Sequence, residues 1–229
     1  MRLSHGIAAV VAFLVMSLPG RSVRADSITS LYNTGVDNSH TVLTDGTIGD
    51  PHYTLVSVPS DATQIRIRTS VGGFPIGPYL GDDTLSTWIG PNNDKVLDGP
   101  VGFYDYQTTF SLIGLNAATA FIGGQWATDN EAIRIVLNGN VVVTGPNQLV
   151  GFDHWTSFNI SNGFVAGLNT LDFVVHNADN GGSNPTALRV EMTGSAAAAP
   201  LPTTAWVGLI LFGGLGVVYG VRQKNFVIA

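Results

Sequence analysis

Carboxylates are the most abundant groups in this 229-residue chain that could do chemistry. All sixteen Asp and Glu residues lie between Asp26 and Glu191 with only five basic residues, so this stretch carries a net charge of −11. A glycosidase needs two carboxylates about 5–10 Å apart, but among sixteen acids some pair meets that distance by chance. The chain has no cysteine, no Gly-x-Ser-x-Gly motif and no His-x-x-x-His pair, which nucleophilic and zinc-dependent hydrolases use. We therefore expect a non-catalytic protein that repels nucleic acid, with a small exported hydrolase as an alternative.

Aromatic residues beside polar loops suggest a second kind of chemistry. Neutral glycans are gripped by a flat aromatic face and a few amide or carboxylate groups. Three tryptophans have such neighbours, in STWIGPNND, GGQWATDNE and GFDHWTSF. The expected ligand-binding residues are Trp88, Trp126, Asp129, Asn130, His154 and Trp155. For Trp126 and Trp155 a place in the core is the better individual interpretation, whereas Trp88 is expected to be exposed.

Oxygen-rich loops could hold a calcium ion, because Asp, Asn and backbone carbonyls are the ligands that calcium prefers. DGTIGDPH (45–52) offers Asp45 and Asp50 as candidate ligands, and GDD (81–83) with NND (92–94) offers others. None of them has the spacing of an EF-hand loop. We expect no required cofactor, and calcium only as a stabiliser of the fold.

The elements that position these residues are predicted to be strands. Apolar and polar residues alternate in TQIRIRT (63–69), TLDFVVHN (170–177) and ALRVEM (187–192), and AIRIVLNGNVVVT (132–144) contains a hairpin signal at Asn138-Gly139. Further strand-like runs are 53–58, 104–112 and 119–124. Seven or more short strands with Asn, Gly and Pro turns predict an all-β antiparallel sandwich or jelly roll.

The order of segments from Tyr104 onward resembles a known domain. YDYQTTFSL, GGQWATDNEAIRIVLNGN, FDHWTSFNISNGFVAGLNTLDFVVHNA and ALRVEM follow one another, as in the galactose-binding-like, sugar-binding jelly roll of family 2 glycoside hydrolases. That domain is an accessory module, and the catalytic barrel that would follow it is absent from this sequence. The resemblance implies a β-sandwich and carbohydrate binding, and related folds often hold one structural calcium.

The two ends of the chain look like processing segments. MRLSHGIAAVVAFLVMSLPGRSVRAD has a basic start, a short apolar stretch and a small residue before the expected cleavage between Ala25 and Asp26, which is typical of a secretory signal peptide. A membrane anchor is the alternative, but an apolar stretch of twelve residues is short for a hydrocarbon core of about 30 Å.

At the C-terminus, an uncharged run of seventeen residues (205–221) precedes Arg222 and Lys224. It reaches about 25 Å as a helix, and the basic residues after it predict a cytoplasmic C-terminus. With Pro200-Leu201-Pro202 before it, this end resembles the PEP-CTERM sorting signal of Gram-negative bacteria, which implies an exosortase-like processing enzyme. Alternatives are a sortase-type Leu-Pro-x-Thr-Gly signal and a buried C-terminal helix.

The sequence thus predicts a signal peptide (1–25), a β-sandwich (26–195), an Ala/Pro linker with the sorting motif (196–204), a transmembrane helix (205–221) and a basic tail (222–229). The predicted location is the cell envelope or extracellular matrix, with anchoring in the inner membrane by the C-terminal helix. The predicted function is binding of extracellular polysaccharide. The alternative is a structural surface or biofilm component that has no discrete ligand.

Overall fold

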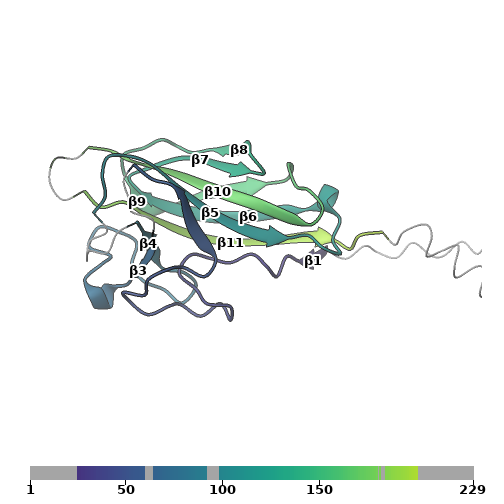
Figure 1. The fold of residues 1–229 in the computed structure, drawn as a ribbon, viewed down its shortest axis with the longest axis horizontal. Helices are drawn as coiled ribbons and strands as arrows, with labels where there is room; N and C mark the ends of the chain where they lie inside the picture. Colours follow the sequence, from purple (N-terminus) through teal and green to yellow (C-terminus); the bar gives the residue numbers. More distant parts are fainter. Residues whose placement is uncertain (1–24, 60–63, 92–97, 180, 182–183, 201–229) are drawn as a thin grey trace, which may run out of the picture.

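A computed structural model describes residues 25–200 except 60–63, 92–97, 180 and 182–183. The described chain is an elongated sandwich of two antiparallel sheets (Figure 1). This confirms the predicted all-β antiparallel fold. Residues 1–24 of the predicted signal peptide, Leu201, Pro202, the apolar run 205–221 and the basic tail lie outside the described residues. Within them, no helix is long and apolar enough to cross a membrane.

One sheet, called here the β10 sheet, has the strand order β2-β5-β10-β7-β8. Its central strands are long and pair in regular register, with Phe173 of β10 between Tyr106 of β5 and Ile135 of β7. The strands are β2 (Tyr53–Ser57), β5 (Gly102–Ser111), β7 (Glu131–Leu137), β8 (Asn140–Thr144) and β10 (Leu168–Asn177).

The other sheet, called here the β11 sheet, has the order β3-β4-β11-β6-β9, and β1 also pairs with β11. Its two short 3-10 helices, η1 (Ser70–Gly72) and η2 (Ala117–Thr119), lie in the connections between strands. The strands are β1 (Ala25–Ser27), β3 (Arg66–Arg68), β4 (Trp88–Gly90), β6 (Phe121–Asp129), β9 (Gly151–Ile160) and β11 (Ala187–Ala197).

The main core lies between the two sheets and follows from the alternation of the strands. Leu171, Phe173 and Val175 are fully buried on one face of β10, as the sequence pattern predicts. Trp126 of β6 packs against Phe173 with ring centres 5.8 Å apart.

The β7–β8 hairpin confirms the Asn-Gly turn signal. Asn138 has φ 51° and Gly139 φ 80°, which is the pair of left-handed conformations that a two-residue hairpin turn of the favoured type requires. The Asn138 side chain also donates from Nδ2 to the Gly163 carbonyl at 3.0 Å. This turn therefore fixes the register of β7 and also contacts the loop that leads into β10.

A second apolar cluster lies on the outer face of the β11 sheet, near the end that holds β3 and β4. Its buried members are Phe74, Trp88, Ala127 and Ala187, and the partly buried Tyr79, Leu80, Phe152 and Trp155 pack against them. On β4, Ile89 enters the main core while Trp88, one residue earlier, points into this second cluster. The segment 70–87 therefore covers one end of the sheet as a layer of its own.

The strands at the two ends of the domain pair with each other. Ala25 lies opposite Ala197, and Asp26 lies opposite Ala196. Strand β11 thus continues two residues into the stretch that the sequence assigns to a linker, and Ala25, the expected last residue of the signal peptide, lies in β1. Pro200 is exposed.

Candidate functional site

The structure does not expose Trp88, so that prediction is wrong. Its side chain is 0% exposed and donates from Nε1 to the Leu80 carbonyl at 3.0 Å. Trp126 is also 0% exposed and belongs to the main core, as its core interpretation expects. Trp155 is half-buried on β9, and the guanidinium carbon of Arg189 lies 5.1 Å from its ring centre. Trp88 and Trp155 thus share the second apolar cluster, whereas Trp126 lies in the main core.

Two of the predicted polar partners lie together, because Asn130 donates from Nδ2 to the Asp129 carboxylate at 2.7 Å. Asp129 and Asn130 are each 2% exposed, and Tyr79 donates its hydroxyl to the Asp129 carboxylate. Burial raises the pKa of Asp129 to about 7, although the Tyr79 hydrogen bond acts to lower it. His154 is exposed on β9, with Nδ1 2.5 Å from the carboxylate of Asp153.

The two predicted calcium ligands are engaged by other groups of the chain. Asp45 pairs with Arg68 at 3.1 Å and accepts the Thr69 backbone N–H at 2.8 Å. The buried Asp50 carboxylate accepts backbone N–H groups from three residues, Gly35, His52 and Tyr53. Among the described residues, no group of three or more His, Asp or Glu side chains could hold a metal ion.

The candidate site is instead an open groove on the outer face of the β11 sheet. It has a volume of about 400 Å³ and runs across β6 and β11, beside the cover segment 70–87. A second cavity of about 330 Å³ shares four lining residues with it and extends along the N-terminal segment toward Ser27 and His40. The groove is lined by Asn33, Leu85, Gly123, Gly124, Gln125, Glu191, Met192 and Thr193.

Two adjacent glycines of β6 line the groove. A Cβ at Gly123 would lie 3.1 Å from a ring carbon of Phe121 and 3.2 Å from the Asn159 side-chain oxygen. A Cβ at Gly124 would lie 2.4 Å from the Glu191 carbonyl. Gly123 therefore lets the Phe121 ring and the Asn159 side chain lie close to the strand on the outer face, whereas Gly124 permits the close packing of β6 against β11. The Phe121 ring, 42% exposed, lies beside Gly123.

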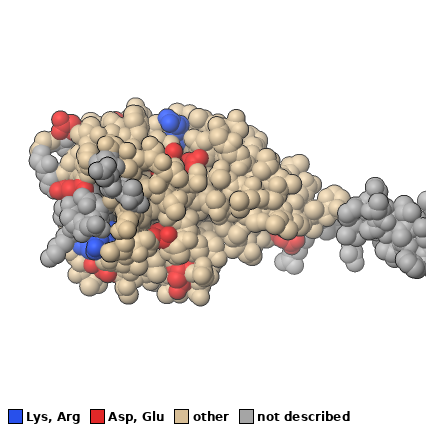
Figure 2. Space-filling model, viewed as in Figure 1, with Lys and Arg blue, Asp and Glu red and all other residues tan. Residues whose placement is uncertain are grey.

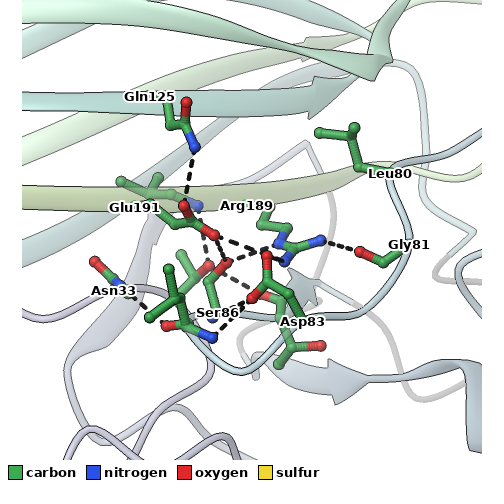
Figure 3. A network of polar contacts seen from close by, with 12 residues as sticks. Asn33, Leu80, Gly81, Asp83, Ser86, Gln125, Arg189 and Glu191 are labelled. Carbon is green, nitrogen blue, oxygen red and sulfur yellow. Dashed lines mark hydrogen bonds and ion pairs between the residues drawn. The ribbon is translucent and has the colours of Figure 1, made fainter.

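Polar side chains line the groove and tie it to the cover segment (Figure 3). Gln125 of β6 donates from Nε2 to Glu191 of β11 at 2.9 Å. Asn33 donates to the Leu85 carbonyl at 3.0 Å and accepts the Met192 backbone N–H at 2.8 Å. One amide side chain thus joins the exposed Leu85 to the edge of β11.

The buried Arg189 holds the groove's carboxylate side in place. Its guanidinium lies 2.5 Å from Asp83 and 3.7 Å from Glu191, and it donates to the Gly81 carbonyl at 2.6 Å. Partial burial acts to raise the pKa of Asp83, but the Leu85 N–H, Arg189 and further hydrogen bonds hold that pKa below its usual value. Glu191 is therefore oriented by Arg189, Ser86 and Gln125 at the groove wall.

Sequence reasoning missed the residues of the groove, although part of a signal was present. The run FIGGQW places two glycines in a strand, which often marks a close approach of backbone or ligand. The pairing of Gln125 with Glu191, 66 residues apart, has no local signature. Of the predicted site residues, none lines the groove.

Comparison with known proteins gives structural likeness only. No protein-family model and no curated protein matches this chain. A family 35 carbohydrate-binding module from Clostridium thermocellum is 13% identical, with 58% of this chain and 88% of that chain covered and a TM-score of 0.33. The family 35 module from Paenibacillus barcinonensis is 15% identical, with coverage of 64% and 98% and a TM-score of 0.34. The CBM36-1 domain of a multidomain xylanase from the hindgut metagenome of Trinervitermes trinervoides is 14% identical, with coverage of 53% and 86% and a TM-score of 0.30. Likenesses at this level assign no function.

Proposed function

We propose that this chain is an exported, non-catalytic protein of the cell envelope that binds a neutral glycan in the groove of the β11 sheet. One observation carries the proposal: a hollow lined by two glycines lies beside an exposed aromatic ring, two amides and a carboxylate held by hydrogen bonds, and an exposed hydroxyl group. These groups are Phe121, Asn33, Gln125, Glu191 and Thr193.

The chemistry of the groove suits a sugar. Sugar hydroxyls both donate and accept hydrogen bonds, and amides and carboxylates can serve both roles between them. The C–H face of a sugar ring packs on an aromatic side chain, which Phe121 supplies at the groove margin. Among the described residues, the lining contains Glu191 and no Lys or Arg, so an anionic glycan would meet repulsion. A neutral glycan is therefore favoured.

The proposed export and location in the cell envelope rest on the sequences of both ends of the chain. A signal peptide with cleavage after Ala25 directs export, and Pro200-Leu201-Pro202 with the apolar run 205–221 directs sorting by an exosortase-like enzyme. Cell fractionation of the full chain against a chain ending at Ala199 tests this part. Retention of the full chain in the envelope and release of the shorter chain are the expected results.

Glycan binding is tested by titration of the full-length protein with a panel of neutral oligosaccharides and the host's own exopolysaccharide. The test variants are Phe121→Ala and Gln125→Ala, and both are expected to weaken binding at least tenfold. The chain offers matched controls on the outer face of the other sheet. There Phe103 is 55% exposed, and Gln107 donates to Asp172 at 2.8 Å, as Gln125 does to Glu191.

Phe103→Ala and Gln107→Ala are expected to leave binding unchanged. Equal losses in both sets would place the ligand elsewhere, and absence of binding in every condition would favour a structural surface component. Each titration is repeated with calcium and with a chelator. The unfolding midpoint of the protein is compared in the same two conditions, because bound structural calcium would raise it.

A further inference from the structure

The C-terminal segment leaves the sandwich beside the loop that connects β5 to η2. Asn116 donates its backbone N–H to the Ala197 carbonyl at 2.7 Å, and Ala199 donates to the Gly114 carbonyl at 2.8 Å. Leu115 and Ala198 form an isolated bridge between these contacts. The direction in which the chain leaves is therefore fixed by the 111–120 loop, up to the last described residues.

Exposed apolar side chains gather at this same end. Ile113 is 82% exposed, Leu168 66% and Val165 47%. The loops that carry them are neighbours, because Leu112 donates its N–H to the Gly167 carbonyl at 2.8 Å and Leu168 pairs with Ser111. Asn169 fixes the second loop by bonding both the N–H and the carbonyl of Val165. The apolar end defined by Ile113, Val165 and Leu168 is thus held in shape by the sandwich.

This end also lacks charge in its loops. Residues 111–120 and 161–169 contain no Asp, Glu, Lys or Arg, although the exported stretch as a whole is strongly acidic. Figure 2 shows charged side chains mainly over the opposite half of the domain, with very few toward the end where the strands lead into the C-terminal segment. Uncharged loops with three exposed apolar side chains are costly in water but suit the boundary of a lipid bilayer.

We propose that the apolar end of the sandwich lies against the membrane that receives residues 205–221. This rests on the anchoring part of the proposed function. Four residues, 201–204, lie between Pro200 and Ala205, and the five Cα-to-Cα steps from one to the other span at most about 17 Å. The tether is therefore too short to hold the domain far from the bilayer. Because the loops are uncharged, contact depends on apolar side chains and needs no anionic lipid. The groove opens on the outer face of a sheet, so this apposition leaves it accessible.

The test uses single-cysteine variants, because the natural chain has no cysteine. Ile113→Cys and Leu168→Cys carry an environment-sensitive fluorophore at the apolar end. Val71→Cys carries it at the opposite end, in η1, where Val71 is 91% exposed. Each full-length variant is reconstituted into phosphatidylcholine vesicles. Quenching is measured with aqueous iodide and with nitroxide-bearing lipid, and a second series adds phosphatidylglycerol.

At positions 113 and 168 we expect blue-shifted emission, strong quenching by nitroxide lipid and several-fold lower quenching by iodide than at position 71. Phosphatidylglycerol should change these values little. Iodide quenching equal at all three positions, in protein that sediments with the vesicles, overturns the proposal and leaves anchoring intact. Failure to sediment overturns anchoring as well. Protection from iodide quenching that appears without lipid and grows with protein concentration overturns the proposed membrane contact in favour of contact between two copies of the chain. None of these outcomes depends on glycan binding.

Discussion

The guanidinium carbon of Arg189 lies 5.1 Å from the centre of the Trp155 ring. The contact joins β11 to β9 across the outer face of their sheet, while the same guanidinium reaches Asp83 and Gly81 in the cover segment. A cation placed on an aromatic face and bonded to a carboxylate is well compensated for its burial. Arg189 therefore fastens the cover segment to the sheet beside the groove.

Removal of this arginine should destabilise the domain. Arg189→Ala leaves the Asp83 and Glu191 carboxylates without their cation, and we expect a loss of about 3 kcal/mol in the free energy of unfolding. Urea denaturation followed by tryptophan fluorescence measures it. Arg134→Ala, which removes an exposed arginine on the other sheet, serves as control and should cost less than about 1 kcal/mol. Equal effects of the two variants would contradict the fastening role.

Trp88→Ala should act on stability and spare the groove. The side chain is fully buried in the second apolar cluster, and truncating a buried aromatic residue costs about 3–5 kcal/mol. Chemical denaturation measures the loss in free energy of unfolding. Glycan titration at low temperature measures whether the protein that remains folded still binds. A variant of unchanged stability that no longer binds glycan would restore Trp88 as a ligand-binding residue.

The two adjacent glycines of β6 should respond differently to the same added methyl group. Gly124→Ala places a Cβ 2.4 Å from the Glu191 carbonyl and 2.7 Å from the Phe158 ring, so backbone must shift and stability should fall by about 1–3 kcal/mol. Gly123→Ala meets only the ends of the Phe121 and Asn159 side chains. It should keep the fold and weaken glycan binding, because the added methyl group displaces the Phe121 ring at the groove margin. Thermal unfolding measures the stability of both variants, and titration measures their glycan binding. A larger loss of stability in Gly123→Ala than in Gly124→Ala would contradict the prediction.

Stability should decrease as pH rises from about 4 to about 7. The pKa of Asp129 is raised by burial from 3.8 to about 7, and burial likewise raises the pKa of Asp50 to about 6. A carboxyl group with a raised pKa binds its proton more tightly in the folded state. Its contribution to the free energy of unfolding is therefore complete below the pKa of the unfolded state. That contribution is lost as pH rises through the pKa of the folded state.

Asp129→Asn mimics the protonated carboxyl group and should flatten this dependence. From the shift of the pKa, the variant could gain up to about 4 kcal/mol relative to the natural chain between pH 4 and pH 8. Urea denaturation at several pH values measures the difference. Parallel stability curves for the two proteins would show that Asp129 titrates at its usual pKa.

The strands could be predicted because their signals are local. Alternation in 170–177 placed Leu171, Phe173 and Val175 on one face, and the Asn138-Gly139 turn needs only its two residues. Both features depend on the chain within a few positions, and both are confirmed. The start of FDHWTSFNISNGFVAGLNTLDFVVHNA, one of the segments that carry the resemblance, forms most of β9.

The site could not be predicted, since it depends on contacts between distant segments. Trp88 does lie on the outer face of its strand, but a segment that begins near Ser70 folds back over it. Alternation tells which face a side chain takes and gives no information on what covers that face. The pairing of Gln125 with Glu191, and the placement of Asn33 beside Leu85, likewise arise only when the sandwich closes.

The attachment of the C-terminal segment to β11 has a mechanical consequence. Strand β11 is central in its sheet and pairs with β6 along nine residues, from Ala187 to Ser195, while β1 and β4 pair with its other edge. A pull on the C-terminus acts along β11, and the ladder bonds lie across that direction, so they share the load in shear and do not open one after another. Under the proposed function, in which the C-terminus is anchored and the groove binds a polysaccharide, β11 is the strand that would carry the tension between the two.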